Sequence, residues 1–252
     1  MTATCNLCGG SQFEDFKVRA MERCIGCGSL ARHRLCVHFA ETFGYLSEPN
    51  TRRMLHIAPE KMTSPVFKTR IGMGYVGADA LPSGYPHVPC LRLFLPDGMD
   101  IFPDHYFDLI VHNHVLEHIP GHFKDALESL LRCVAVGGMM IFSVPGPWYG
   151  RTTEEGGELL ATDAERVARF GQANHLKRFG GDMPRWLASR PDGERLNDTL
   201  PDDVMERLSL SRRCPTMIWR RTAPVSESAD RVPEAVVPGV LRGEIRNRHR
   251  NQ

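Results

Sequence analysis

The sequence predicts an α/β protein built on a parallel sheet, with a small metal-binding module near its N-terminus. An apolar run beginning at Phe107 leads into a helical pattern, and a second apolar run at residues 139–144 follows it. A strand, a helix and a strand in this order form a βαβ unit, whose two strands are parallel. The second observation is that four cysteines form two Cys-x-x-Cys pairs within the first 27 residues.

The composition is that of a globular chain. The chain has 252 residues, of which 42% are hydrophobic and 24% are charged. A chain of this length and hydrophobic content can bury one sizeable core and carry a small additional module. No stretch approaches the roughly 20 consecutive apolar residues that cross a bilayer, and the N-terminus lacks the pattern of a signal peptide. We therefore expect a cytoplasmic protein without a membrane partner. The net charge of +1 is too small for the electrostatic field of the whole molecule to attract nucleic acid or an anionic membrane.

The N-terminal cysteines have the spacing of a structural zinc site. Cys5 and Cys8 form one pair, Cys24 and Cys27 form the other, and fifteen residues separate them. Four thiolates complete the shell of Zn²⁺ and leave no open position for catalysis. A redox role is disfavoured because neither pair begins a helix beside a βαβ unit. We call this four-cysteine segment the zinc ribbon. Two roles remain open for it: the metal stabilises a segment too short to fold alone, or the segment recognises a partner or substrate.

A helix is expected from Ser29 to about Phe43. Its basic start, Arg32-His33-Arg34, has two interpretations. These side chains either meet a phosphate or carboxylate, or they form a solvated helix face or bond to the ribbon. The turn at Glu48-Pro49-Asn50 marks a domain boundary.

The first strand of the sheet, residues 53–57, leads into Ala58-Pro59-Glu60 at an expected helix start. In nucleotide-binding α/β domains this loop is usually rich in glycine, which lets the backbone approach the ligand, and those glycines are absent here. Pro59 suits a first helical turn. Glu60 either interacts with the helix dipole or meets an amino group of a ligand.

Acidic residues follow the next two strands. Residues 74–79 form a strand that ends in Asp79, at the spacing where a carboxylate accepts the hydroxyls of a ribose. A third strand at residues 88–95 runs into a loop that contains Asp97 and Asp100. Either acid could hold an adenine amino group, and the alternative is that both are solvated.

The fourth strand ends in polar residues. Asn113, His114, Glu117 and His118 follow the apolar run, and the helical pattern after them is expected to stop at Gly137-Gly138. In parallel sheets ligands bind outside the carboxyl ends of the strands. These residues are therefore candidates for a ligand site, although Glu117 has a second explanation because a carboxylate is favoured in a first helical turn.

The segments FDLI (107–110), HVLEHI (114–119) and VGG (136–138) resemble the class I S-adenosylmethionine-dependent methyltransferases. Within them the chain is similar to a subgroup with an N-terminal zinc ribbon and with LHIAPE (55–60) in place of the glycine-rich loop. The resemblance implies a Rossmann-like seven-stranded methyltransferase sheet. The expected division of the chain is a zinc ribbon at 1–28, a linking helix at 29–50 and a methyltransferase domain at 51–221, with an acceptor lid at about 146–181 that the resemblance implies. From residue 222 the chain has little apolar periodicity, which predicts a disordered tail at 222–252.

The resemblance implies S-adenosylmethionine as cofactor, beside structural Zn²⁺. Ala58 to Glu60 are expected to line its methionine part, Asp79 its ribose, and the end of the fourth strand its sulfonium. The full set of expected cofactor residues is His56, Ala58, Pro59, Glu60, Asp79, Asp97, Asp100, Asn113, His114 and Val115.

Methyl transfer needs alignment of the acceptor and, for many acceptors, removal of a proton. His114, His118 and His175 are the candidates for this second task, and hydrogen bonding or helix capping is the alternative role. Trp148, Tyr149, Gln172, His175 and Arg178 are candidates for binding the acceptor, and the polar ones among them could instead tie the lid to the sheet.

Three functions fit these observations. The first is methylation of a small molecule or biosynthetic intermediate. The second is methylation of RNA with the ribbon as a recognition module, which the near-neutral charge and the lack of a basic stripe disfavour. The third is a binding protein that has lost the cofactor, an idea prompted by the missing glycines.

Overall fold

Seven strands form one sheet in the order β5-β4-β3-β6-β7-β9-β8. This computed structural model describes residues 3–146, 150–196, 199–210 and 216–223. The expected acceptor contacts Trp148 and Tyr149, and the expected tail from residue 224, lie outside these ranges. The strands are β3 (Met54–Ile57), β4 (Tyr75–Asp79), β5 (Cys90–Arg92), β6 (Phe107–Asn113), β7 (Val134–Ser143), β8 (Gly193–Leu196) and β9 (Thr216–Arg221).

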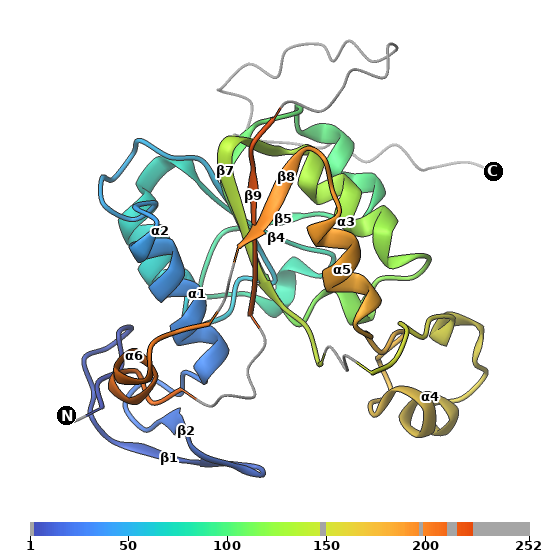
Figure 1. Ribbon diagram of the computed structural model, residues 1–252, viewed down its shortest axis with the longest axis horizontal. Helices are drawn as coiled ribbons and strands as arrows, with labels where there is room; N and C mark the ends of the chain where they lie inside the picture. Colours follow the sequence, from blue (N-terminus) through green and yellow to red (C-terminus); the bar gives the residue numbers. More distant parts are fainter. Residues whose placement is uncertain (1–2, 147–149, 197–198, 211–215, 224–252) are drawn as a thin grey trace.

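The first five strands of this order are parallel, and β9 runs antiparallel to both of its neighbours. Helices cover both faces, which explains why β3 is buried along its whole length and the central strands are mostly apolar. Figure 1 shows α1 (Ala31–Thr42) and α2 (Ser64–Ile71) on one face and α3 (Phe123–Arg132) and α5 (Asp182–Ala188) on the other. The predicted seven-stranded Rossmann-like fold is therefore confirmed.

Each face has its own apolar core. Helix α3 contributes Phe123, Ala126, Leu127, Leu130 and Leu131, at the spacing of a helix with one buried stripe. Helix α1 packs Leu35 and Phe39 toward Leu109 and Ile141 of the sheet. The expected linking helix is thus a structural layer of the sheet domain. Among the described residues, no helix is both long and apolar enough to cross a bilayer.

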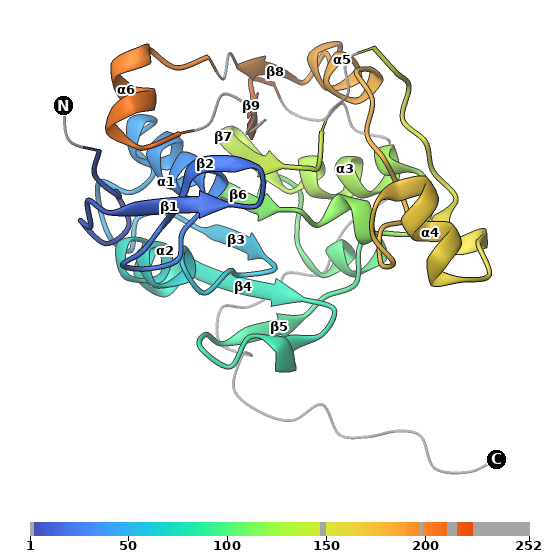
Figure 2. The ribbon, with the colours of Figure 1, turned by 90° about the horizontal axis from the view of Figure 1, so that it is seen from below.

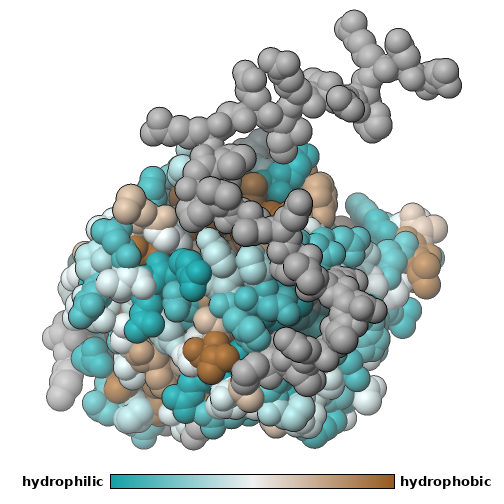
Figure 3. All heavy atoms as spheres, turned by 90° about the horizontal axis from the view of Figure 1, so that it is seen from above, coloured by the Kyte–Doolittle hydropathy of each residue, from teal (hydrophilic) through white to brown (hydrophobic). Residues whose placement is uncertain are grey.

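Smaller elements lie around the sheet. The hairpin of β1 (Phe13–Phe16) and β2 (Arg19–Cys24) lies beside the start of α1 together with α6 (Asp202–Arg207). In Figure 2 the strands β3, β4, β6 and β7 point toward the side on which α4 (Asp163–Phe170) lies. In the view of Figure 3, hydrophilic side chains predominate over scattered hydrophobic ones among the described residues that are visible.

Two local expectations were wrong. Helix α2 begins at Ser64, because residues 61–63 form a turn after Glu60. The pair Gly137-Gly138 lies inside β7 and does not end α3, which stops at Arg132. Gly137 has a φ of +79°, and a Cβ on Gly138 would lie 3.0 Å from the carbonyl oxygen of Asp108. The glycines therefore permit a close approach of β7 to β6.

Candidate functional site

The bend after β3 keeps a glycine-like backbone without glycine. Ala58 has a φ of +50°, in the left-handed region that favours glycine. Its N–H donates to the carbonyl of Ala78 at 2.9 Å, and the carbonyl of Pro59 lies 2.9 Å from Nε2 of His87. Contacts with the end of β4 and the loop after it therefore hold the bend in this shape.

Glu60, the last residue of the bend, is the centre of a hydrogen-bonded network. Its Oε1 lies 2.7 Å from Nε2 of His33 and 3.3 Å from Nε of Arg32, both on α1. Its Oε2 accepts from Nδ2 of Asn113 at 3.0 Å, and Oδ1 of Asn113 accepts from the hydroxyl of Ser143 at 2.7 Å. The network thus joins α1 to the carboxyl ends of β3, β6 and β7.

The protonation of this network follows from its partners. Nδ1 of His33 accepts the backbone N–H of Leu30 at 2.9 Å, so the proton of the ring lies on Nε2 and is donated to Glu60. Burial lowers the pKa of His33, which agrees with a neutral ring. Burial opposes ionisation of Glu60, yet its contacts with His33, Arg32 and Asn113 hold its pKa at about 2. Glu60 is therefore a carboxylate.

These contacts decide between the interpretations of the basic helix start. His33 and Arg32 meet a carboxylate, and the buried Arg34 bonds to the ribbon. The solvated-face interpretation was wrong for His33 and Arg34. Glu60 lies before α2 and already has three side-chain partners, so its acceptor capacity is largely taken up within the protein.

Asp79 ends β4 at the carboxyl edge of the sheet. Its Oδ1 accepts the N–H of Leu81 at 2.8 Å, and its Oδ2 accepts the hydroxyl of Tyr85 at 3.1 Å. A carboxylate has about four lone-pair positions, so each oxygen retains capacity for another donor. The carboxylate is held in one orientation and can still accept two hydroxyl groups.

Several expected cofactor residues lie away from this edge. His56 is 1% exposed, bonds to the hydroxyl of Tyr75 and packs against Phe67, so it is removed from any surface that a cofactor reaches. Asp100 pairs with Arg132 at 3.7 Å. Because Arg132 ends α3, which runs back from the carboxyl edge, Asp100 lies toward the opposite edge of the sheet. These surroundings do not favour the expected cofactor roles of His56 and Asp100, which remain predictions.

Other expected residues have mixed surroundings. Val115 belongs to the core under α3, and Asn113 is buried in the Glu60 network. Asp97 is exposed in the loop after β5. Contacts of these three with a cofactor remain predictions.

The three candidate histidines gather around Glu117. Nδ1 of His114 donates to Oε1 of Glu117 at 3.1 Å. The rings of His118 and His175 lie edge to face, with centroids 5.1 Å apart. One ligand atom from each of Glu117, His118 and His175 lies within 4.8 Å of the others. The sequence therefore brings these side chains to one corner, beyond the end of β6.

The segment after α4 is fastened to this corner. The N–H of Leu176 donates to the carbonyl of Glu117 at 2.7 Å, and Nδ1 of His118 donates to the carbonyl of Asn174 at 2.8 Å. Lys177, which is buried, donates to the carbonyls of Ile119 and Gly121. Four hydrogen bonds, from both backbone and side-chain donors, therefore hold this part of the expected lid against the corner.

Arg178 and Gln172 differ in their surroundings. Arg178 donates to Glu154 at 2.8 Å, and the backbones of these two residues also pair. The interpretation in which Arg178 ties the lid together is thus the one that the contacts favour. Gln172 is exposed and remains a predicted acceptor contact.

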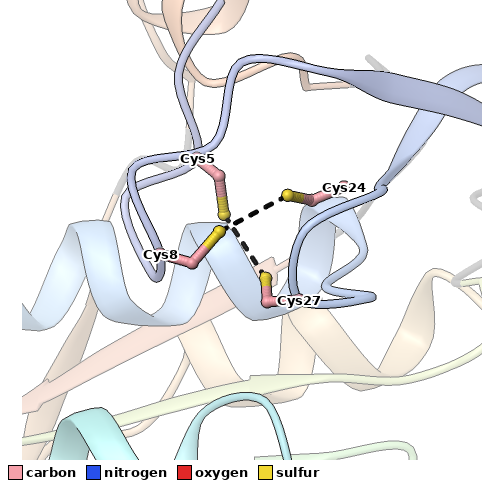
Figure 4. Close-up of side chains that lie close together, drawn as sticks. All are labelled: Cys5, Cys8, Cys24 and Cys27. Carbon is pink, nitrogen blue, oxygen red and sulfur yellow. Dashed lines mark hydrogen bonds between the residues drawn. The ribbon is translucent and has the colours of Figure 1, made fainter.

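The four N-terminal cysteines converge from two loops (Figure 4). The sulfurs of Cys5 and Cys27 are 3.7 Å apart, and those of Cys8 and Cys24 are 3.6 Å apart. A tetrahedron with Zn–S bonds of about 2.3 Å has sulfur–sulfur edges of about 3.8 Å. The N–H of Gly10 also points to the sulfur of Cys8 at 3.4 Å, a contact that stabilises thiolate ligands.

Arg34 connects this ribbon to the sheet domain. Its guanidinium is fully buried and donates to the carbonyls of Glu22 and Ser29 on one side and of Leu208 and Ser209 on the other. A buried guanidinium is tolerated when its donors are satisfied in this way. The ribbon is thus docked against α1 and the end of α6.

Two important residues, Tyr85 and His33, were not among the expected site residues, and Glu117 was expected at the site without a catalytic or cofactor role. The helix dipole was one explanation for Glu117, and the approach of His175, 58 positions away, could not be predicted from the local sequence. Tyr85 lies six residues after Asp79, a spacing with no regular period. His33 was considered in the sequence but without its partner.

Comparison with known proteins gives one match by family and several by structure. Residues 40–197 match the model of a family described as a methyltransferase domain. No curated protein matches the sequence. An S-adenosylmethionine-dependent methyltransferase from Archaeoglobus fulgidus is similar with 13% identity and a TM-score of 0.49, over 77% of this chain and 95% of its own.

Two further solved structures are similar at the same level. The first is the 1,6-didemethyltoxoflavin-N1-methyltransferase of Burkholderia thailandensis with bound 1,6-didemethyltoxoflavin and S-adenosylhomocysteine, with 12% identity, a TM-score of 0.48 and coverage of 76% of this chain and 79% of its own. The second is an S-adenosylmethionine-dependent methyltransferase from Mesorhizobium loti, with 13% identity, a TM-score of 0.44 and coverage of 74% and 98%. Such low identities say nothing about the substrate.

Proposed function

Because this chain belongs to the methyltransferase domain family, which its residues 40–197 match, we propose that it transfers the methyl group of S-adenosylmethionine to a small-molecule acceptor. The protein is a class I S-adenosylmethionine-dependent methyltransferase. The finer part of the proposal concerns the residues that hold the cofactor and the nature of the acceptor.

The position and orientation of the Asp79 carboxylate support the cofactor assignment most directly. It lies at the carboxyl end of β4, its orientation is fixed by Leu81 and Tyr85, and its oxygens can accept two more donors. These properties fit the two hydroxyls of a ribose. The left-handed backbone of Ala58 fits the same ligand, because it supplies the bend that glycine supplies elsewhere.

S-adenosylmethionine supplies an electrophilic methyl group on a sulfonium. The residues of this chain then have two tasks, which are to hold the acceptor in line and to receive its proton. His114 is suited to the second task because its side chain is 37% exposed and its Nδ1 is held by Glu117. Gln172 and His175 are proposed to contact the acceptor.

The four cysteines are proposed to bind structural Zn²⁺. Their sulfur separations fit a tetrahedral site, and all four positions are taken by thiolates. The docking of the ribbon through Arg34 supports the stapling role, since its contacts are with the chain itself.

Calorimetry with S-adenosylmethionine tests the function. We expect wild type and Asp203→Ala, an exposed position on α6, to bind the cofactor with similar affinity, and Asp79→Ala to lose at least about tenfold, or about 1.4 kcal/mol. Equal affinity in wild type and Asp79→Ala would remove the ribose assignment. No binding to wild type at high micromolar concentration would favour a binding protein without cofactor.

A second experiment separates a small-molecule acceptor from RNA. Filter binding with total RNA is expected to show no retention of the full chain at physiological salt, because the net charge is +1. Salt-sensitive retention that disappears when the four cysteines are replaced by serine would favour the RNA methyltransferase.

A further inference from the structure

The side chain of Glu117 is buried without a full set of partners. It is 0% exposed, and while Oε1 accepts from His114, Oε2 has no hydrogen-bond partner among the described residues. An unpaired carboxylate oxygen in the interior is costly, so such an atom requires an explanation. A bound cation would explain both the unpaired oxygen of Glu117 and the presence of two histidines beside it.

The two nearest histidines lie beside each other, and one has the second contact that is typical of a metal ligand. Nδ1 of His118 donates to the carbonyl of Asn174. A carbonyl that holds one ring nitrogen as N–H leaves the lone pair of the other nitrogen available. The ring of His118 thus has one nitrogen available for another partner, and the buried ring of His175 lies edge to face against it.

We propose that Glu117, His118 and His175 bind a divalent transition-metal cation such as Zn²⁺. One ligand atom of each lies within 4.8 Å of the others, which is close enough for a common cation after small side-chain adjustments. Two imidazoles and one carboxylate form the ligand set of catalytic zinc sites, which retain an open position. This site therefore differs in kind from the closed four-cysteine site of the ribbon.

The location of the cation gives the acceptor class, a step that rests on the proposed function. Glu117 and His118 follow the carboxyl end of β6, and His175 reaches them from the segment after α4; His118 is partly exposed, so the open position is accessible. It takes a hydroxyl oxygen of the acceptor, whose pKa falls on coordination. The oxygen forms a bond to the methyl carbon, the carbon–sulfur bond breaks with its electron pair left on sulfur, and the hydroxyl proton passes to His114, the proton acceptor of the proposed function.

Equilibrium dialysis of the full chain against zinc tests the site. Wild type is expected to bind two zinc ions per chain, Glu117→Gln and His175→Ala one each, and the control His38→Ala two. His118→Ala, whose side chain is partly exposed, provides a variant with little risk of misfolding and is also expected to bind one. One zinc ion in wild type, or two in all three ligand variants, would overturn the proposal.

The open position has its own test. Acetohydroxamate, a bidentate oxygen ligand of zinc, is expected to bind zinc-loaded wild type in calorimetry and not zinc-loaded Glu117→Gln, in which only the closed ribbon site is filled. Absence of binding to wild type would contradict an open position. Calorimetry of the same samples with S-adenosylmethionine distinguishes the two proposals. Cofactor binding without a second zinc ion overturns only the metal site. A second zinc ion without cofactor binding overturns only the methyltransferase function.

Discussion

Nε2 of His33 lies 2.7 Å from Oε1 of Glu60, so a helix that precedes the sheet in sequence holds the bend that follows its first strand. The contact is a hydrogen bond from a neutral ring, because Nδ1 of His33 accepts a backbone N–H. The charge of Glu60 is balanced by Arg32. This contact therefore connects α1, which also contacts the zinc ribbon, to the bend proposed to bind the cofactor.

The pKa of Glu60 makes stability dependent on pH. Its folded pKa of about 2 lies below the ordinary value of 4.5, so the charged form stabilises the fold above about pH 4.5, and this contribution is lost as the pH falls toward 2. Glu60→Gln should lower the free energy of unfolding by about 2 kcal/mol at neutral pH. Urea unfolding from pH 3 to 7 should show the difference from wild type shrinking below pH 4.5, whereas parallel curves would contradict the assignment.

Tyr85 is expected to support cofactor binding through Asp79. Tyr85→Phe removes the donor to Oδ2, so the carboxylate loses one of its two orienting contacts. We expect a loss of about 1 kcal/mol in S-adenosylmethionine binding, or roughly fivefold, measured by calorimetry. Tyr106→Phe, on a different part of the sheet domain, is the control and should bind as wild type does.

The ribbon should lose its metal when one thiolate is removed. Cys24→Ser is expected to lower the zinc content by one ion per chain and to lower the thermal midpoint, because metal binding is linked to folding of the ribbon. Elemental analysis and thermal unfolding measure the two effects. Cys90→Ser, outside the cluster, should keep the zinc content of wild type, and an unchanged content in Cys24→Ser would refute the four-thiolate site.

Arg34 should be sensitive even to a conservative change. Arg34→Lys keeps the charge but cannot reach the four carbonyls that the guanidinium serves, which leaves buried acceptors unpaired. A loss of about 3 kcal/mol in the free energy of unfolding is expected from denaturant titration. Arg52→Lys, at a half-exposed position, is the matched control and should cost less than about 1 kcal/mol.

The elements of the sheet could be predicted because their signals are local. The apolar run of β6 and the buried stripe of α3 depend only on the period of their own residues. The end of α3 was misjudged because Gly137-Gly138 is a common helix stop, and only the pairing of β7 with β6 shows why two glycines are needed there.

The partners within the site could not be predicted from local patterns. Glu60 was expected to face a ligand, since nothing in its own segment indicates that His33, 27 positions earlier, approaches it. The surroundings of His56 could not be predicted for a related reason, because its own short strand does not indicate that Tyr75 and Phe67 enclose it. Conversely, His114 and His118 were proposed as site residues because they follow a strand end, where ligands bind, and their catalytic role stays a prediction.

Lys177 limits how substrates reach the histidine corner. Moving the segment that carries His175 would break the hydrogen bonds from the buried Lys177 ammonium group to the carbonyls of Ile119 and Gly121. Such a movement is unfavourable because it would leave buried polar groups without partners. That segment is consequently expected to stay in place beside the histidine corner when an acceptor binds.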